Sequence, residues 1–152
     1  MRISSALVLP GLALLCLPAA TAQQPAAGQP AAIRITTDSS QVIANGKDVA
    51  LVHVDIVDSQ GYVVPDADNL LSFSVTGEGK LLGVDNGNER DDNSFKLNSR
   101  KAFKGHAFAV IQAGRKPGDI SISVQADGLP AATAKIGTFK STPELQNIED
   151  LK

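Results

Sequence analysis

The chain has 152 residues, a formal net charge of −2 and 43% hydrophobic residues, with one cysteine and no tryptophan. Its length suits a single domain. The weakly acidic balance excludes binding that depends on a basic surface, so neither nucleic acid nor an anionic membrane is expected as a partner. Because the cysteine has no second cysteine to pair with, the fold must rely on its apolar core.

The first 22 residues have the three parts of a secretory signal peptide. Met1 and Arg2 precede the uncharged run ISSALVLPGLALLCLPAA, and Ala20-Thr21-Ala22 supplies the small residues of a cleavage site. The run is short for a membrane span and is interrupted by prolines. We therefore expect export, with cleavage near Ala22 and a periplasmic or secreted product. A lipoprotein signal at Cys16 is disfavoured because two leucines precede it.

Residues 23–31, QQPAAGQPA, have no apolar periodicity and predict a flexible leader. The folded domain is expected over residues 32–139. It opens at 33–37 with an alternation of apolar and polar residues that is typical of a half-buried strand. Residues 49–58, VALVHVDIVD, form the clearest predicted strand. One face of it should point to the core with Ala50, Val52, Val54 and Ile56.

Further strands are predicted at 71–76, 80–84, 102–112, 120–125 and 131–139, with turn sequences between them. About seven or eight short strands without helical periodicity predict an all-β fold, an immunoglobulin-like antiparallel two-sheet sandwich. Residues 140–152 form a polar tail. Thr142, Pro143 and apolar residues at three-residue spacing allow a short helix there, although a frayed tail is favoured.

The connection at 83–105, GVDNGNERDDNSFKLNSRKAFKG, is long and polar for a small β domain, and such loops are commonly functional. Its defining residues are turn formers that tolerate positive φ, two phenylalanines expected to anchor the loop on a sheet edge, and a basic residue before the next strand: Gly83, Asn86, Gly87, Gly105, Phe95, Phe103 and Arg100. Arg100 and Lys101 are expected to pair with Asp91 or Asp92 as exposed ion pairs, each worth about 0–1 kcal/mol.

Hard oxygen donors crowd the start of this loop, which suggests a calcium site. The candidate ligands are Asp85, Asn86, Asn88, Glu89 and Asp91. The EF-hand template fails, because Arg90 stands where its glycine belongs and Lys96 where its last glutamate belongs. The favoured alternative is a solvated loop whose Asn and Asp side chains bond to their own backbone. No other cofactor is expected.

No catalytic residue is predicted. The loop carboxylates lie in turns that lack the burial needed to tune a general acid for glycoside hydrolysis. His53 and His106 are too few for a zinc centre, and His53 is expected on an exposed strand face beside Asp55. Few aromatic side chains are available for stacking against a sugar ring, since the chain has one tyrosine and no tryptophan.

The sequence from Val52 to Gln112 resembles the C-terminal immunoglobulin-like domain of bacterial β-galactosidases of glycoside hydrolase family 2. The resemblance is carried by VHVDIVDSQGYVVPDADN at 52–69, LSFSVTGEGKLLGVDNGN at 71–88 and SFKLNSRKAFKGHAFAVIQ at 94–112. It implies an accessory domain, with catalysis by two glutamates of a separate (β/α)8 barrel. Such a barrel needs about 250 residues, which this chain does not supply.

The expectation is therefore a stand-alone, exported, non-enzymatic module that binds or scaffolds, with a protein or a glycan as partner. One alternative is a split or accessory subunit of a glycoside hydrolase that acts with a separate catalytic chain. Another is a cell-surface adhesive module of the invasin-like kind, which shares the sandwich fold. Tandem repeats would favour that last hypothesis, and the sequence has none.

Overall fold

The computed structural model describes residues 28–141. The predicted signal peptide, most of the leader and the C-terminal segment from residue 142 lie outside the described residues. Within residues 28–141 there is no helix, and hence none that could cross a membrane. The described strands are β1 (Ala32–Thr37), β2 (Gln41–Ile43), β3 (Val49–Val57), β4 (Leu70–Gly77), β5 (Gly79–Asp85), β6 (Ser99–Lys101), β7 (His106–Ala113), β8 (Gly118–Ala126) and β9 (Leu129–Phe139).

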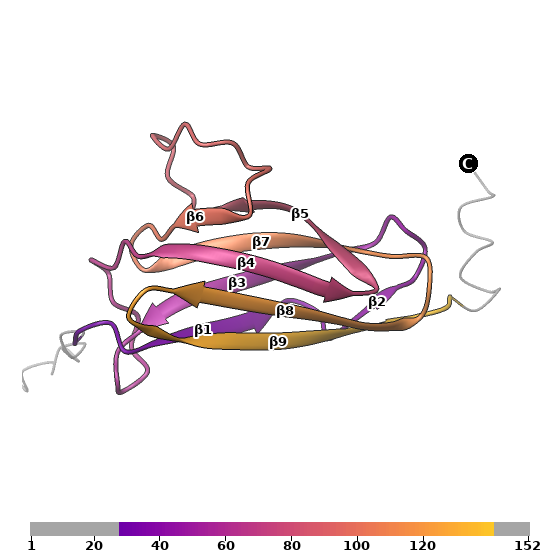
Figure 1. The fold of residues 1–152 in the computed structure, drawn as a ribbon, viewed down its shortest axis with the longest axis horizontal. Helices are drawn as coiled ribbons and strands as arrows, with labels where there is room; N and C mark the ends of the chain where they lie inside the picture. The colour runs from indigo at the N-terminus through magenta and orange to yellow at the C-terminus, as the bar shows by residue number, and fades with distance from the viewer. Residues whose placement is uncertain (1–27, 142–152) are drawn as a thin grey trace, which may run out of the picture.

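The strands form two sheets that pack face to face as a sandwich (Figure 1). The four-stranded sheet has the order β1-β3-β7-β5, and the five-stranded sheet has the order β2-β9-β8-β4-β6. All pairings are antiparallel except β2 with β9, which is parallel. The predicted all-β sandwich is confirmed.

The strand count and the uniform antiparallel pairing were not predicted correctly. Nine strands are described, because β2 and β6 are three-residue edge strands. Segments this short show no apolar alternation from which a strand can be recognised. The strand predicted at 102–112 begins later than expected: β6 ends at Lys101, before this range, and β7 begins only at His106, after a tight turn through Lys104 and Gly105.

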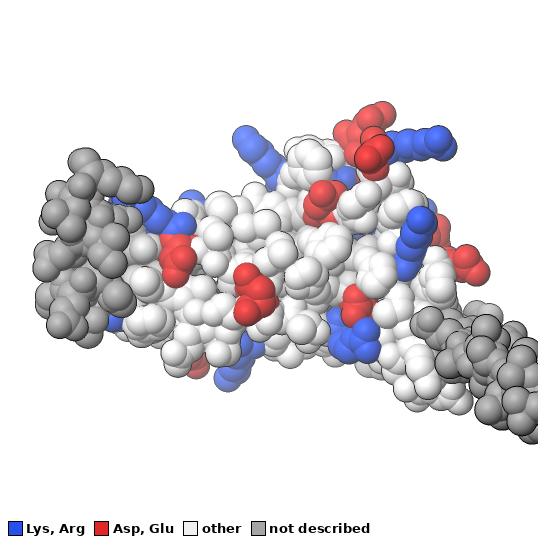
Figure 2. All heavy atoms as spheres, turned by 180° about the vertical axis from the view of Figure 1, so that it is seen from behind, with Lys and Arg blue, Asp and Glu red and all other residues white. Residues whose placement is uncertain are grey.

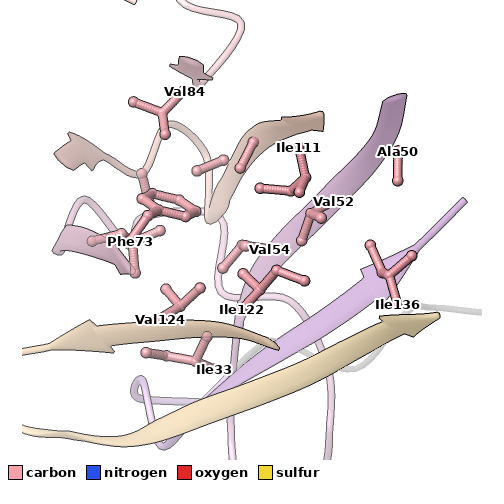
Figure 3. Close-up of a cluster of buried hydrophobic side chains, with 14 of the residues drawn as sticks. Ile33, Ala50, Val52, Val54, Phe73, Val84, Ile111, Ile122, Val124 and Ile136 are labelled. Carbon is pink, nitrogen blue, oxygen red and sulfur yellow. The ribbon is translucent and has the colours of Figure 1, made fainter. Parts of the chain in front are cut away.

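The core lies between the two sheets and consists mainly of aliphatic side chains (Figure 3). The four residues predicted to face inward from β3, Ala50, Val52, Val54 and Ile56, are all buried. They meet Ile122 and Val124 of β8 and the ring of Phe73 from β4. Fully burying one Val or Ile side chain contributes about 1.5–3 kcal/mol, so this layer supplies the main stabilisation of the fold.

Candidate functional site

The long loop leaves the sandwich between β5 and β6 and projects beyond the two sheets (Figure 1). It spans residues 86–98, less than the stretch noted in the sequence, since β5 runs to Asp85 and β6 begins at Ser99. Its second half is fixed to both sheets. Val84 of β5 donates its N–H to the Phe95 carbonyl at 2.8 Å, and Phe73 of β4 donates to the Asn98 carbonyl at 2.8 Å.

Arg100 holds the loop from inside. Its side chain points inward from β6, and the residue is only 2% exposed. Nη2 donates to the carbonyls of Val84, at 3.2 Å, and Asn93, at 3.1 Å. Nη1 lies 2.9 Å from Oδ2 of Asp91, and the guanidinium carbon lies 5.4 Å from the centroid of the Phe95 ring. One guanidinium therefore connects a strand end, the loop backbone, a carboxylate and an aromatic ring.

The predicted partner of Arg100 is confirmed, but the expectation of an exposed pair was wrong. The loop folds back over β6, and only 1% of the Arg100 side chain and 11% of the Asp91 side chain remain accessible. Within the described residues, Nε of Arg100 has no hydrogen-bond partner. Nη1 forms an ion pair with Asp91, but the two groups are not aligned for a hydrogen bond. Lys101 forms an exposed pair as expected, but with Asp68, at 3.5 Å, rather than with Asp91 or Asp92.

Asp91 is held as a carboxylate by several donors. Asn93 donates to its Oδ1 from the backbone N–H at 3.1 Å and from the side-chain amide at 2.6 Å. These hydrogen bonds, followed by the contact with Arg100, lower the pKa of Asp91 to about 2. The carboxylate therefore stays ionised through the neutral and mildly acidic range.

Asn86 is the second buried polar residue of the loop, at 4% exposure. Its amide donates to Oδ2 of Asp91 at 3.0 Å and to the Lys101 carbonyl at 2.9 Å, and its Oδ1 accepts the N–H of Asn88 at 2.9 Å. Every polar atom of this amide has a partner, as burial requires. Asn86 thus joins the start of the loop to its end.

Most of the predicted calcium ligands are engaged in local hydrogen bonds. Asp85 accepts the N–H of Asn86 at 2.7 Å, and Asn88 accepts the N–H of Arg90 at 3.1 Å, in the pattern of Asx turns. Glu89 is exposed. Among residues 28–141, no three His, Cys, Asp or Glu side chains gather closely enough to hold a metal ion. The calcium site stays an untested hypothesis, and the local hydrogen bonding expected of the favoured alternative, a solvated loop, is observed.

A shallow groove of about 380 Å³ lies beside the loop on the outer face of the four-stranded sheet. Its walls come from three adjacent strands and from the loop: Leu51, Phe108, Val110, Gly83, Val84, Asp85 and Phe95. Strand register explains the grouping, because Leu51 of β3 pairs with Val110 of β7, which pairs with Gly83 of β5. Only Asp85 among the lining residues has a polar side chain, so the groove is apolar.

Gly83 and its neighbours shape this groove, but not through the turn geometry expected from the sequence. Positive φ occurs at Gly87, with φ 72°, and at Gly105, with φ 81°, but not at Gly83 or Asn86. Gly83 is required instead by a close approach, since a Cβ there would lie 2.8 Å from the Phe95 carbonyl oxygen. A register irregularity beside it, between Leu81 and Gly83, lets β5 bend around the loop.

The two loop phenylalanines differ from their expected anchoring role. Phe95 is bound to β5 through its carbonyl, but the residue is 59% exposed and forms one wall of the groove. Phe103 is half-buried, and its backbone pairs with His106 across the turn. At Gly105 a Cβ would lie 2.5 Å from the Val64 carbonyl oxygen, which explains glycine at that turn.

A polar cluster that the sequence did not reveal lies on the same outer face. Asp55 accepts hydrogen bonds from Arg34, at 2.6 Å from Nη2, and lies 2.8 Å from Nδ1 of His106. Burial alone would raise the pKa of Asp55, but the hydrogen bonds from Arg34 and His106 outweigh it and lower the pKa. His53 is not simply exposed beside Asp55, since its ring meets Phe108 edge to face at 5.1 Å. Cross-strand register creates this cluster.

A match to a known protein family shows where the chain belongs. Residues 33–135 match the model of glycoside hydrolase family 2 C-terminal domain 5. The chain belongs to this family. The resemblance noted in the sequence is thereby confirmed, and the matched residues of the family 2 C-terminal domain include nearly all of the described sandwich.

Relatives carry this domain within much longer chains. The β-galactosidase BoGH2A of Bacteroides ovatus is 46% identical over 110 residues, which are 72% of this chain and 13% of that protein. The solved structure of a glycosyl hydrolase family 2 member from Bacteroides cellulosilyticus has a TM-score of 0.74 and 32% identity, covering 75% of this chain and 15% of that one. An intimin D00-D0 structure, with 20% identity and a TM-score of 0.53, shares the fold alone.

Proposed function

We propose that this family 2 C-terminal domain is an exported, non-catalytic module that binds a protein partner through the groove and the adjoining loop. The groove on the outer face of the four-stranded sheet carries this proposal. Outer faces of antiparallel sheets are commonly polar, and contiguous apolar patches on a surface mark interaction sites. Here Leu51, Phe108 and Val110 form such a patch on adjacent strands.

Further exposed apolar side chains lie in β5 and in the loop. Leu82, beside the irregularity of β5, and Leu97, in the loop, are each more than two-fifths exposed, as is Phe95 of the groove wall. Acidic side chains gather on the projecting loop, with basic ones close by (Figure 2). Apolar residues bordered by mixed charges are typical of a protein interface. A sugar would need several polar contacts, and the groove offers one carboxylate, Asp85.

The non-catalytic role is supported by what the chain shares with its relatives. It spans 13% of the β-galactosidase and 15% of the solved family 2 structure that it matches. The matched residues are those of a C-terminal domain. Hydrolysis by this family requires, as the resemblance implies, a barrel of about 250 residues. Export is supported by the signal-peptide pattern of residues 1–22.

A second candidate function follows from the relatives' architecture. Because the same domain is covalently joined to a longer chain in BoGH2A, the partner of this chain would be a family 2 catalytic chain that lacks the domain. The module would then serve as a separate accessory subunit. The two candidates differ in the identity of the partner and share the binding surface.

Two experiments test the proposal and separate the candidates. The purified chain is expected not to hydrolyse a chromogenic β-galactoside, and hydrolysis abolished by substituting a loop carboxylate would overturn the non-catalytic role. Calorimetry with family 2 catalytic chains from the same host tests the subunit hypothesis. Val110→Lys, in the groove, should weaken binding at least tenfold, whereas Leu70→Lys, on the exposed face of β4, should not.

A further inference from the structure

A second hollow is lined by the turn between β4 and β5, at one end of the sandwich. This turn lies at the right of Figure 1. It has a volume of about 360 Å³. It is lined by glycine-rich turns and by polar side chains: Gly46, Gly77, Glu78, Gly79, Lys80, Gln112, Ala113, Gly114 and Arg115. No aromatic and no large aliphatic side chain contributes to the lining. The composition is therefore opposite to that of the apolar groove.

Backbone hydrogen bonds make this hollow rigid. The Glu78 N–H donates to the Asp119 carbonyl at 3.0 Å, and the Glu78 carbonyl accepts the Gly114 N–H at 2.7 Å. The Gly114 carbonyl accepts the Gly46 N–H at 3.0 Å, and the Gly46 carbonyl accepts the side-chain amide of Gln112 at 3.0 Å. Four successive hydrogen bonds thus connect three turns, and the binding groups they carry are held in place before a ligand arrives.

The glycines keep the hollow open. A Cβ at Gly114 would lie 2.9 Å from the Glu78 carbonyl oxygen, and one at Gly77 would lie 2.1 Å from the Asp119 carbonyl oxygen. Gly46 has φ 75°, a conformation that disfavours other residues. Side chains at these positions would both clash and fill the space.

Three charged side chains line the hollow without pairing with one another. Within residues 28–141, no side-chain hydrogen bond or ion pair is formed by Glu78, which is a half-buried residue, or by Lys80 and Arg115, which are exposed. Among the described residues, the buried side-chain atoms that lack a partner belong to Arg100, so the Glu78 oxygens are accessible from the hollow, where a carboxylate accepts hydrogen bonds. The space beside Glu78 therefore suits a ligand that donates hydrogen bonds.

The mixture of charges restricts the class of ligand. A phosphate would meet the carboxylate of Glu78, and a metal cation would meet Lys80 and Arg115. A neutral molecule with hydroxyl groups suits both the carboxylate and the two cations, since a hydroxyl donates one hydrogen bond and accepts others. We propose that this hollow binds one sugar unit of a glycan, with Glu78 accepting from its hydroxyls and Arg115 and Lys80 donating to them.

The proposal is tested by amide NMR titration of the exported chain with methyl β-D-galactopyranoside and, separately, with inorganic phosphate. We expect the sugar to shift resonances of the turns at 77–80 and 112–115, with a Kd on the order of 1 mM. Glu78→Ala and Arg115→Ala should each weaken binding at least fivefold. Lys116→Ala is the matched control, since Lys116 is exposed, adjacent and outside the lining.

Three results would overturn the assignment. They are the absence of any shift at these turns up to about 100 mM sugar, binding that persists unchanged in both lining variants, and tighter binding of phosphate than of the sugar. Circular dichroism of each variant confirms that it is folded. The sugar-binding result does not depend on the proposed protein-binding groove, because the two sites share no lining residue. Val110→Lys, which alters the groove, leaves every residue of this hollow unchanged.

Discussion

Arg100 and Asp91 form a buried ion pair between the sandwich and the loop that leaves it, with 2.9 Å between Nη1 and Oδ2. Burying a guanidinium is costly, and the cost is offset here by the carbonyls of Val84 and Asn93 and by the carboxylate. Such a pair adds little net stability compared with apolar packing, but it selects one loop conformation. In that conformation Phe95 stands at the edge of the groove.

Replacing Arg100 by alanine should destabilise the domain strongly. The change leaves Asp91 without its cation, removes two hydrogen bonds to carbonyls and opens a cavity at a residue that is 2% exposed. Removing one member of a buried pair typically costs about 3–5 kcal/mol, and we expect a loss near the lower value. Urea denaturation measures it.

The neighbouring residue provides the control for this substitution. Lys101→Ala removes a pair in which both side chains are more than three-fifths exposed, so the loss should stay below about 0.5 kcal/mol. Equal effects of the two substitutions would contradict the anchoring role of Arg100. Arg100→Met, which preserves volume, should be milder than Arg100→Ala.

The pKa of Asp91 predicts a particular pH dependence of stability. Its folded-state pKa, about 2, lies below the unfolded value of about 3.9, so the folded state binds fewer protons between these values. The stabilisation from this carboxylate is therefore complete above about pH 5 and is lost as the pH falls through about 2.

Urea denaturation of Asp91→Asn and of the unmodified chain should show a stability difference that is constant above about pH 5 and shrinks below it. The shifts at Asp55 and Asp58 cancel in this comparison. A difference that stays constant down to about pH 2 would contradict the assignment.

The sandwich could be predicted because its signal is local. Alternation along β3 and β8 places Val52, Val54 and Ile122 in the core whatever the neighbouring strands are. The burial of Arg100 could not be predicted, since a charged side chain is expected at the surface and its carbonyl partners are up to 16 residues away. The groove also escaped prediction, because it depends on the register that aligns Leu51, Val110 and Gly83.

Gly83→Ala should destabilise the domain and disturb the groove. The added Cβ would lie 2.8 Å from the Phe95 carbonyl oxygen, so either the loop or β5 must shift and the hydrogen bond from Val84 weakens. We expect a loss of about 1–3 kcal/mol in thermal or urea denaturation.

A second glycine in a strand provides the comparison. At Gly137 of β9 the nearest atoms to an added Cβ lie at 3.7 and 3.8 Å, and the backbone needs no positive φ. Gly137→Ala should therefore be neutral or stabilise by up to about 1 kcal/mol through the unfolded state. Destabilisation of the same size at both positions would show that the close contact with Phe95 is not the cause of the effect at Gly83.

Calcium is expected to bind the loop weakly or not at all. The oxygens of Asp85, Asn88 and Asp91 already accept backbone hydrogen bonds, and the charge of Arg100 lies 2.9 Å from the Asp91 carboxylate, where it opposes a cation. Melting curves in EDTA and in about 10 mM calcium should coincide, because a ligand stabilises only in proportion to ln(1 + [L]/Kd). A site with a Kd of about 0.1 mM would instead add about 2.7 kcal/mol. If the melting temperature rises with calcium and Glu89→Gln abolishes the rise, the loop is a calcium site and its hydrogen bonds rearrange on binding.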